Sequence, residues 1–169
     1  MSNVILVGYM GCGKSTVGKR LSYRMKMPYT DTDKEIEKKQ GTTISLIFKE
    51  QGETAFRDME TECLKRLFEY KQDYVIAVGG GLPMREENRS LMRKLGTTVY
   101  LRAKPETIYE RLKDDTTRPL LQGENPQEKI RSMINQRSPF YEEAADVVID
   151  VDGKSFDEIM DEIEEAVSK

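Results

Sequence analysis

The chain of 169 residues contains no histidine and only two cysteines, Cys12 and Cys63. Two cysteines are too few for a disulfide framework, and without histidine the chain can build neither a zinc finger nor a Ser-His-Asp nucleophile. Any catalysis must therefore use carboxylates, lysines, arginines, hydroxyls and backbone amides. The length predicts a single domain, residues 1–169, with enough mass to bury a hydrophobic core.

Long hydrophobic segments and an excess of basic residues are also missing. No apolar run approaches the roughly 20 residues that a membrane span needs, and residues 1–8 lack the basic and apolar regions of a signal peptide. The formal net charge is −3, so no global positive charge is available to neutralise nucleic-acid phosphates. We therefore expect a cytoplasmic protein without a membrane or nucleic-acid partner. No long apolar stripe demands a dimer, which favours a monomer.

Short apolar segments alternate along the chain with segments of helical periodicity. Five apolar segments are typical of β-strands: residues 4–7, 29–30, 74–78, 98–101 and 146–149. Helices are expected at residues 14–25, 32–40, 43–50, 54–70, 85–95, from 105 onward, at 126–141 and after the N-cap residue Ser155. Because parallel strands need helical crossovers, this order predicts a doubly wound α/β fold with a five-stranded parallel sheet.

Residues 8–15, Gly-Tyr-Met-Gly-Cys-Gly-Lys-Ser, match the pattern G-x-x-x-x-G-K-S between a strand and a helix. In that setting backbone N–H groups and the helix N-terminus can hold phosphate oxygens. Lys14 can reach the β- and γ-phosphates, and the Ser15 hydroxyl can hold Mg²⁺. We therefore predict a nucleotide site made by Gly11, Cys12, Gly13, Lys14, Ser15 and Thr16.

The phosphate loop alone does not identify the reaction. A guanine-reading N/T-K-x-D segment is absent, which argues against a GTPase switch. A hydrolysing ATPase usually has an apolar strand that ends in aspartate; Asp150 follows such a strand, but at the far end of the chain. The better acidic neighbour for a magnesium ion is Asp31, after the second strand, which we expect to contact the ion through water.

Three further stretches are candidates for an acceptor site, because ligands of open parallel sheets bind beyond the carboxyl ends of the strands. They are Asp31-Thr32-Asp33, the glycines Gly79-Gly80-Gly81, and Arg57 with Glu60 three residues later on a helix. The glycines would let a ligand approach the backbone, and Glu60 could orient the Arg57 guanidinium. Each feature alone could be a helix cap, a plain turn or a surface ion pair, but their combination favours a ligand site.

The order and spacing of these motifs resemble those of shikimate kinases over nearly the whole chain. The shared features are the phosphate loop, Asp31-Thr32-Asp33, Phe56-Arg57 with Glu60, Gly79-Gly80-Gly81, Arg118-Pro119-Leu120-Leu121, Arg137 with Pro139 and Tyr141, and Ala145-Asp146-Val147. The resemblance implies a P-loop kinase fold with strand order 2-3-1-4-5, acceptor-binding helices at about 32–70 and a lid at about 113–125. It also implies transfer of the γ-phosphoryl group of Mg-ATP to the 3-hydroxyl of shikimate, a step of chorismate and aromatic amino-acid biosynthesis.

The resemblance further implies roles for individual residues. Asp33 would bind ring hydroxyls and orient or deprotonate the attacking one. The shikimate carboxylate would be held by Arg57, Arg137 and the turn of Gly79, Gly80 and Gly81, mainly through the Gly80 amide. Lys14 and the lid residue Arg118 would act on the phosphates, and Arg111 and Lys154 would lie beside the adenine. Two arginines and an aspartate suit a small ring with one carboxylate and several hydroxyls.

Two other interpretations stay open at this point. The first is a P-loop kinase of another small acceptor, such as gluconate or a nucleoside monophosphate, against which the paired arginines and the glycine turn argue. The second is a catalytically silent homologue that binds nucleotide and regulates a partner, although every catalytic position is filled. An assay with shikimate, gluconate and AMP in parallel separates the three.

Overall fold

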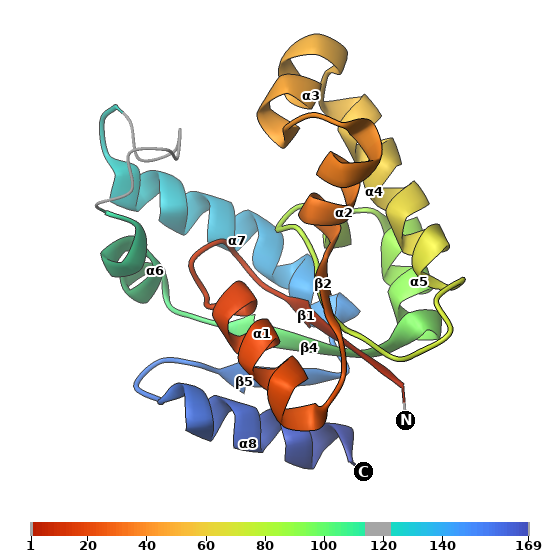
Figure 1. Cartoon of the computed structure of the whole chain (residues 1–169). Helices are drawn as coiled ribbons and strands as arrows, with labels where there is room; N and C mark the ends of the chain where they lie inside the picture. The colour runs from red at the N-terminus through yellow and green to blue at the C-terminus, as the bar shows by residue number, and fades with distance from the viewer. Residues whose placement is uncertain (1, 114–122, 169) are drawn as a thin grey trace.

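The computed structural model describes residues 2–113 and 123–168, in which the five predicted strands form one sheet (Figure 1). The strands are β1 (Asn3–Val7), β2 (Tyr29–Asp31), β3 (Val75–Ala77), β4 (Gly96–Arg102) and β5 (Val147–Asp150). Their order across the sheet is β2-β3-β1-β4-β5, and every neighbouring pair is parallel. The predicted α/β class and strand order are confirmed.

Strand β1 lies at the centre of the sheet because its residues are apolar on both faces. Ile5, Leu6 and Val7 are fully buried. Leu6 pairs in register with Ala77 of β3 and with Val99 of β4. A strand buried on both faces needs no polar alternation, which explains its continuous apolar run. The end of β1 therefore delivers the following loop to the middle of the carboxyl edge of the sheet.

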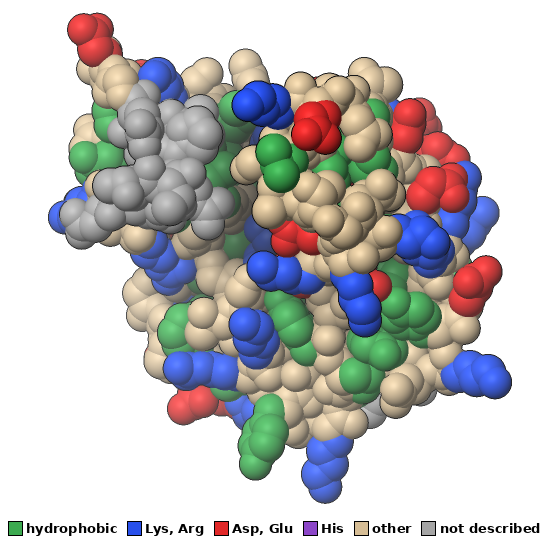
Figure 2. Space-filling model, turned by 45° about the horizontal axis from the view of Figure 1, so that its top comes forward, with side chains coloured by type: hydrophobic (Ala, Val, Ile, Leu, Met, Phe, Trp, Pro, Cys, Tyr) green, Lys and Arg blue, Asp and Glu red, His purple; other side chains and the backbone are tan. Residues whose placement is uncertain are grey.

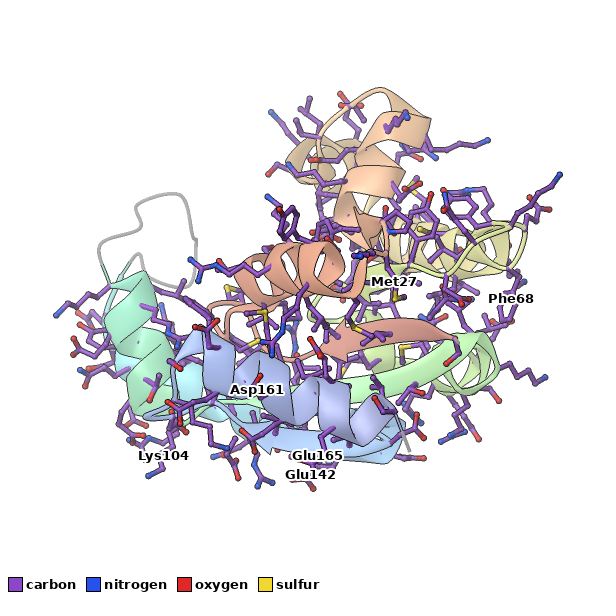
Figure 3. The ribbon with its side chains drawn as sticks, turned by 60° about the horizontal axis from the view of Figure 1, so that its bottom comes forward. Met27, Phe68, Lys104, Glu142, Asp161 and Glu165 are labelled. Carbon is purple, nitrogen blue, oxygen red and sulfur yellow. The ribbon has the colours of Figure 1, made fainter. Side chains whose placement is uncertain are left out.

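Helices cover both faces of the sheet. One face carries α1 (Lys14–Met25) and α8 (Phe156–Val167), which lie side by side and are joined by ion pairs from Arg24 to Asp161 and Glu164 (Figure 3). The other face carries α5 (Glu86–Leu95) and α7 (Pro126–Ala144), with α6 (Pro105–Leu112) packed against α7. This doubly wound arrangement leaves the carboxyl edge of the sheet open.

Three helices at residues 32–67 project from the sheet (Figure 1), so the last of them ends three residues before the predicted limit of 70. They are α2 (Thr32–Gln40), α3 (Ile44–Gln51) and α4 (Glu53–Leu67). They have a small core of their own, which consists of Ile36, Ile47, Phe56 and Cys63. Helix α4 runs from this cluster to the sheet, where Leu64 and Leu67 join the main core. It therefore connects the projecting helices to the body of the domain.

Some element boundaries differ from the predicted ones. Helix α7 continues through Pro139 to Ala144, past the predicted end at Tyr141, because the buried side chains of its last turn pack on the core. This packing outweighs the helix hydrogen bond that a proline cannot donate. Strand β4 begins earlier than predicted, at Gly96, because that residue pairs with the first residue of β1. A short 3-10 helix, η1 (Leu82–Met84), follows the three glycines where no element is predicted.

The predicted lid at residues 113–125 lies mostly outside the described residues, and so does Arg118. In residues 2–113 and 123–168, no helix combines the length and the apolar character needed to cross a bilayer.

Candidate active site

A cavity of about 720 Å³ opens at the carboxyl edge of the sheet. Its lining comes from the loop after β1, the ends of β2 and β3, the first residues of α1 and α2, and helices α6, α7 and α8. The lining residues are Met10, Gly11, Gly13, Lys14, Ser15, Thr16, Asp31, Asp33, Ala77, Val78, Gly79, Gly80, Arg111, Leu112, Arg137 and Phe156. Figure 2 shows Lys and Arg side chains around a hollow on this side of the molecule. The cavity thus lies where ligands of open parallel sheets bind.

The phosphate loop leaves β1 at Gly8 and enters α1 at Lys14. Gly8 has a φ of +151°, and a Cβ on it would lie 2.7 Å from Cys12 Sγ and 2.8 Å from the Leu101 carbonyl oxygen, so the loop requires glycine there. Gly13 is the N-cap of α1, and no side chain caps this helix. The first N–H groups of α1 therefore lie beside the cavity without a side-chain acceptor, as an anion site requires.

Lys14 folds back over the phosphate loop. Its Nζ donates a hydrogen bond to the Gly8 carbonyl oxygen at 2.5 Å, and the residue lines the cavity. An ammonium group at this place can exchange the carbonyl for a phosphate oxygen. Cys12, in contrast, is buried and does not line the cavity, and its N–H donates to the Tyr9 carbonyl oxygen at 3.1 Å. The structure therefore brings five of the six predicted loop residues to the cavity lining, but not Cys12.

Asp31 and Asp33 lie at the start of α2, on another side of the cavity. Asp31 is the N-cap of this helix: its Oδ1 accepts from the N–H groups of Asp33 at 2.8 Å and Lys34 at 3.3 Å. Asp33 Oδ1 is buried and has no hydrogen-bond partner within the described part of the chain. Burial, together with the Asp31 carboxylate, raises the pKa of Asp33, whereas Lys14 lowers it. Asp33 is therefore the carboxylate available to a ligand.

Arg57 and Glu60 form the predicted pair on α4. Arg57 Nη1 donates to Glu60 Oε1 at 2.7 Å, and only 1% of the Glu60 side chain is exposed. Burial raises the pKa of Glu60 to about 7, although Arg57 opposes this shift. The guanidinium lies against the glycine turn, because a Cβ on Gly81 would be 2.5 Å from both Nη1 and Nη2. Arg57 and Gly81 thus lie beside the cavity lining rather than within it.

Arg137 reaches the same glycine turn from α7. It lines the cavity, and a Cβ on Gly80 would lie 3.0 Å from its Nη1. The guanidinium carbon is 5.7 Å from the centre of the Tyr9 ring. Two guanidinium groups from helices far apart in the sequence therefore flank the turn of residues 79–81. Such a pair suits a carboxylate ligand.

The cavity ends beyond the phosphate loop at Arg111 and Phe156. Arg111 Nη1 donates to the Gly11 carbonyl oxygen at 3.0 Å. A Cβ on Gly13 would lie 3.4 Å from Arg111 Nη1 and 3.7 Å from the Phe156 ring, so both side chains border the loop. The Arg20 guanidinium packs over the same ring at 4.7 Å from its centre. A cation and an aromatic ring at this end can hold a planar base.

Lys154, predicted beside the adenine, does not line the cavity. Its Nζ forms an ion pair with Glu162 Oε2 at 2.8 Å on α8. Phe156, two residues later, lines the cavity instead and is not among the site residues that the sequence predicts. The available signal was a large aromatic side chain directly after the N-cap Ser155, at a helix start near the sheet edge. Met10 and Leu112 also line the cavity, but nothing in the sequence around them indicates this.

Comparisons with known proteins agree with one another. A family model described as shikimate kinase matches residues 10–168. A curated shikimate kinase from Thermodesulfovibrio yellowstonii is 44% identical over 163 residues, which are 96% of this chain and 93% of the relative. The solved structure of a shikimate kinase from Acinetobacter baumannii in complex with shikimate has a TM-score of 0.90 at 38% identity, and the match covers 99% of this chain and 93% of that one. A gluconokinase structure from Sinorhizobium meliloti 1021 has a TM-score of 0.59 at 14% identity, over 99% of this chain and 90% of that one, and is alike in fold alone.

Proposed function

This chain belongs to the shikimate kinase family, and we propose that it transfers the γ-phosphoryl group of ATP to the 3-hydroxyl of shikimate, on the route to chorismate and the aromatic amino acids. One observation carries the proposal: a single cavity joins the phosphate loop to Asp33 and to Arg137 at the glycine turn. A phosphate donor and a small hydroxylated anion can therefore lie in contact. Phosphoryl transfer needs mainly such positioning and charge neutralisation.

The nucleotide end of the cavity suits ATP. The uncapped N–H groups of α1 and the loop amides would hold the β- and γ-phosphates, and Lys14 would exchange the Gly8 carbonyl for a γ-phosphate oxygen. The base would lie between Arg111 and Phe156, where a guanidinium and a ring border the loop. Lys154 would have to leave Glu162 to reach the base, and its contact stays a prediction.

The residues near the phosphate loop fit a magnesium ion that arrives with the nucleotide. Ser15 and Asp31 both line the cavity, and the Oδ2 of Asp31 takes no part in the cap of α2. The described residues contain no cluster of three or more His, Cys, Asp or Glu side chains that could hold a metal ion. The other ligands would therefore be phosphate oxygens and water, as is usual for Mg²⁺. Ser15 would bind the ion directly and Asp31 through water, and the ion would neutralise phosphate charge.

The acceptor end suits shikimate. Arg57, Arg137 and the Gly80 amide would bind the carboxylate, while Asp33 would accept the hydrogen bond of the attacking hydroxyl. As the hydroxyl oxygen bonds to the γ-phosphorus, its proton would pass to Asp33 and ADP would leave. The raised pKa of Asp33 makes its carboxylate a stronger proton acceptor than an exposed aspartate, and Lys14 favours the ionised form. Arg118, beyond the described residues, is proposed as a further cation on the transferring group.

The test is ADP release by the purified protein with shikimate, gluconate and AMP as parallel acceptors. We expect release that depends on shikimate, and phosphorus NMR of the product should show a phosphate ester on the ring. Release with gluconate or AMP instead would identify a different small-molecule kinase. Nucleotide binding without release in any arm would identify the silent homologue.

A further inference from the structure

The side chain of Tyr141 is buried next to the glycine turn and plays no part in the function proposed above. Tyr141 lies near the end of α7 and is 0% exposed. Its hydroxyl bonds to the Gly80 carbonyl oxygen at 2.6 Å, and its ring packs against Tyr100 with 5.2 Å between ring centres. The hydroxyl therefore reaches the middle residue of the turn that borders the acceptor end of the cavity.

The direction of this hydrogen bond is defined by chemistry. A carbonyl oxygen can only accept, so the Tyr141 hydroxyl is the donor. Burial raises the pKa of Tyr141 above its usual value of 10, and the hydroxyl keeps its proton throughout the pH range in which enzymes work. The Tyr141 hydroxyl can therefore donate to the Gly80 carbonyl oxygen over this whole pH range.

Three successive glycines have no side chains to limit rotation of their backbone, so an outside contact must hold the turn. The N–H groups of Leu82 and Met84 in η1, the element that follows, donate to the Gly79 and Gly81 carbonyl oxygens at 3.1 and 3.2 Å. Two further hydrogen bonds come from segments distant in the sequence. The Gly79 N–H donates to Thr32 Oγ1 at 3.0 Å, and the Gly80 carbonyl accepts from Tyr141. Between these two contacts the Gly80 N–H makes no hydrogen bond to any described residue. It is the group that the proposed function assigns to the shikimate carboxylate.

Arg137 lies one helical turn before Tyr141 on α7, so both side chains project from the same face of the helix. A Cβ on Gly80 would lie 3.0 Å from Arg137 Nη1 and 3.6 Å from Tyr141 Oη. The guanidinium also lowers the pKa of Tyr141 through its charge and a hydrogen bond. The tyrosine hydroxyl is therefore in contact with both groups that would meet the carboxylate, Arg137 and the Gly80 peptide.

We propose that Tyr141 is a positioning residue for the acceptor: its hydroxyl holds the Gly80 carbonyl and Arg137 so that the Gly80 N–H and the guanidinium face one carboxylate. This inference rests on the proposed function. It differs from a purely structural role, in which a buried tyrosine only satisfies its own hydrogen bond. The two roles differ in what removal of the hydroxyl does to each substrate.

The first experiment compares Tyr141→Phe with the wild type in steady-state kinetics. Loss of one hydrogen bond that positions a charged contact should raise the KM for shikimate about tenfold, with less than a twofold change in kcat and in the KM for ATP. Tyr100→Phe is the matched control: it removes a hydroxyl from the same pair of packed rings, but that hydroxyl bonds to Ser138 rather than to the turn. In Tyr100→Phe, kcat and the KM values for shikimate and ATP should all stay within twofold of the wild type.

The second experiment replaces shikimate by its methyl ester, which lacks the negative charge. On the ester, Tyr141→Phe and the wild type should differ less than twofold in kcat/KM, because the positioned groups have no anion to bind. Thr32→Val, which removes the acceptor of the Gly79 N–H, should repeat the selective rise in the KM for shikimate. The Thr32→Val variant therefore still tests the proposal if Tyr141→Phe folds poorly.

The possible outcomes are distinct. An unchanged KM for shikimate in Tyr141→Phe, or an equal loss on shikimate and on the ester, would overturn the positioning role and leave only a structural one. Absence of wild-type turnover with shikimate would instead count against the proposed function itself. Wild-type turnover with a selective, carboxylate-dependent defect in Tyr141→Phe would establish the inference.

Discussion

Asp33 and Glu60, from two different helices, direct their carboxylates at the same glycine. A Cβ on Gly79 would lie 2.9 Å from Asp33 Oδ1 and 3.1 Å from Glu60 Oε2. Neither of these two oxygens has a hydrogen-bond partner in the part of the chain that the structure describes. The two buried carboxyl groups therefore meet beside the acceptor end of the cavity, where burial raises the pKa of each.

The buried carboxylate of Glu60 predicts a specific pH dependence of stability. Its pKa is about 7 in the folded chain and 4.5 in an exposed glutamate, so the folded state binds more protons between these values. The free energy of unfolding should therefore fall as the pH rises through this range, by up to roughly 3 kcal/mol. Glu60→Gln, which cannot ionise, should remove that part of the slope in denaturant titrations at pH 5 and pH 8.

The control for this prediction is Glu62→Gln, because Glu62 lies on the same helix with 64% of its side chain exposed. Its pH dependence should match that of the wild type. An unchanged slope in Glu60→Gln would show that Glu60 does not bind the extra proton.

The lack of space for a side chain at Gly79 allows a steric test of the role of Asp33. The Cβ of Gly79→Ala would press on Asp33 and Glu60, and one of the carboxylates must move. We expect kcat/KM for shikimate to fall about 100-fold, since small displacements of reacting groups have effects of that size. Gly41→Ala serves as the control: its Cβ has no neighbour within 4 Å, and its φ of +67° should cost only roughly 1 kcal/mol of stability. Normal turnover in Gly79→Ala would remove Asp33 from the reaction.

Lys14→Met should abolish transfer and leave the fold intact. The ammonium group donates its hydrogen bond to the loop carbonyl of Gly8, so its loss removes charge from the phosphates rather than from the core. A drop in kcat of at least roughly 100-fold is expected for a group of this kind. Lys19→Met, on the exposed side of α1, should keep wild-type kcat. Circular dichroism checks both folds, and wild-type turnover in Lys14→Met would refute the phosphate-loop assignment.

Arg57→Ala and Arg137→Ala should weaken shikimate binding far more than ATP binding. Each removes a charged hydrogen-bond donor beside the glycine turn, which costs about 1.5–3 kcal/mol. Titration calorimetry with each substrate measures the difference. Arg131→Ala is the control on α7, because its guanidinium pairs with Glu106 on the surface. An equal loss of affinity for both substrates would contradict the division of the cavity into donor and acceptor ends.

Whether adenine stacks on Phe156 can be tested by fluorescence, because the chain contains no tryptophan. Phe156→Trp should place the only indole at the base end of the cavity, where stacking of adenine would quench its emission on addition of ATP but not of shikimate. Phe68→Trp provides the control: Phe68, labelled in Figure 3, is 44% exposed at the end of α4 and does not line the cavity. Equal responses of the two variants to ATP would exclude stacking at Phe156.

Local features of the protein could be predicted because their physical causes are local. The phosphate loop is one continuous segment, and its glycines, Lys14 and Ser15 define its chemistry wherever the chain places it. The same holds for the pair of Arg57 and Glu60, which lie one helical turn apart and form the expected bond. The alternation of apolar strands with helices likewise predicts a parallel sheet without any knowledge of contacts.

Contacts between distant segments could not be predicted in this way. Lys154 and Phe156 are two residues apart, yet only the packing of α8 on α1 decides that the ring lines the cavity and the ammonium pairs with Glu162. Similarly, only the fold shows that Asp31 caps α2 while Asp33 is left for a ligand.

By itself, the sequence determined the class of fold, the phosphate loop and the types of residue at the strand ends, because hydrophobic period, glycine content and short-range spacing act along the chain. The tertiary structure alone decided that Arg137 and Tyr141 of α7 meet the Gly80 turn, and that Glu60 is buried against Asp33. The reason is that burial and close approach depend on how helices pack across the sheet. That packing sums many weak contacts between segments far apart in sequence, and no single motif encodes it.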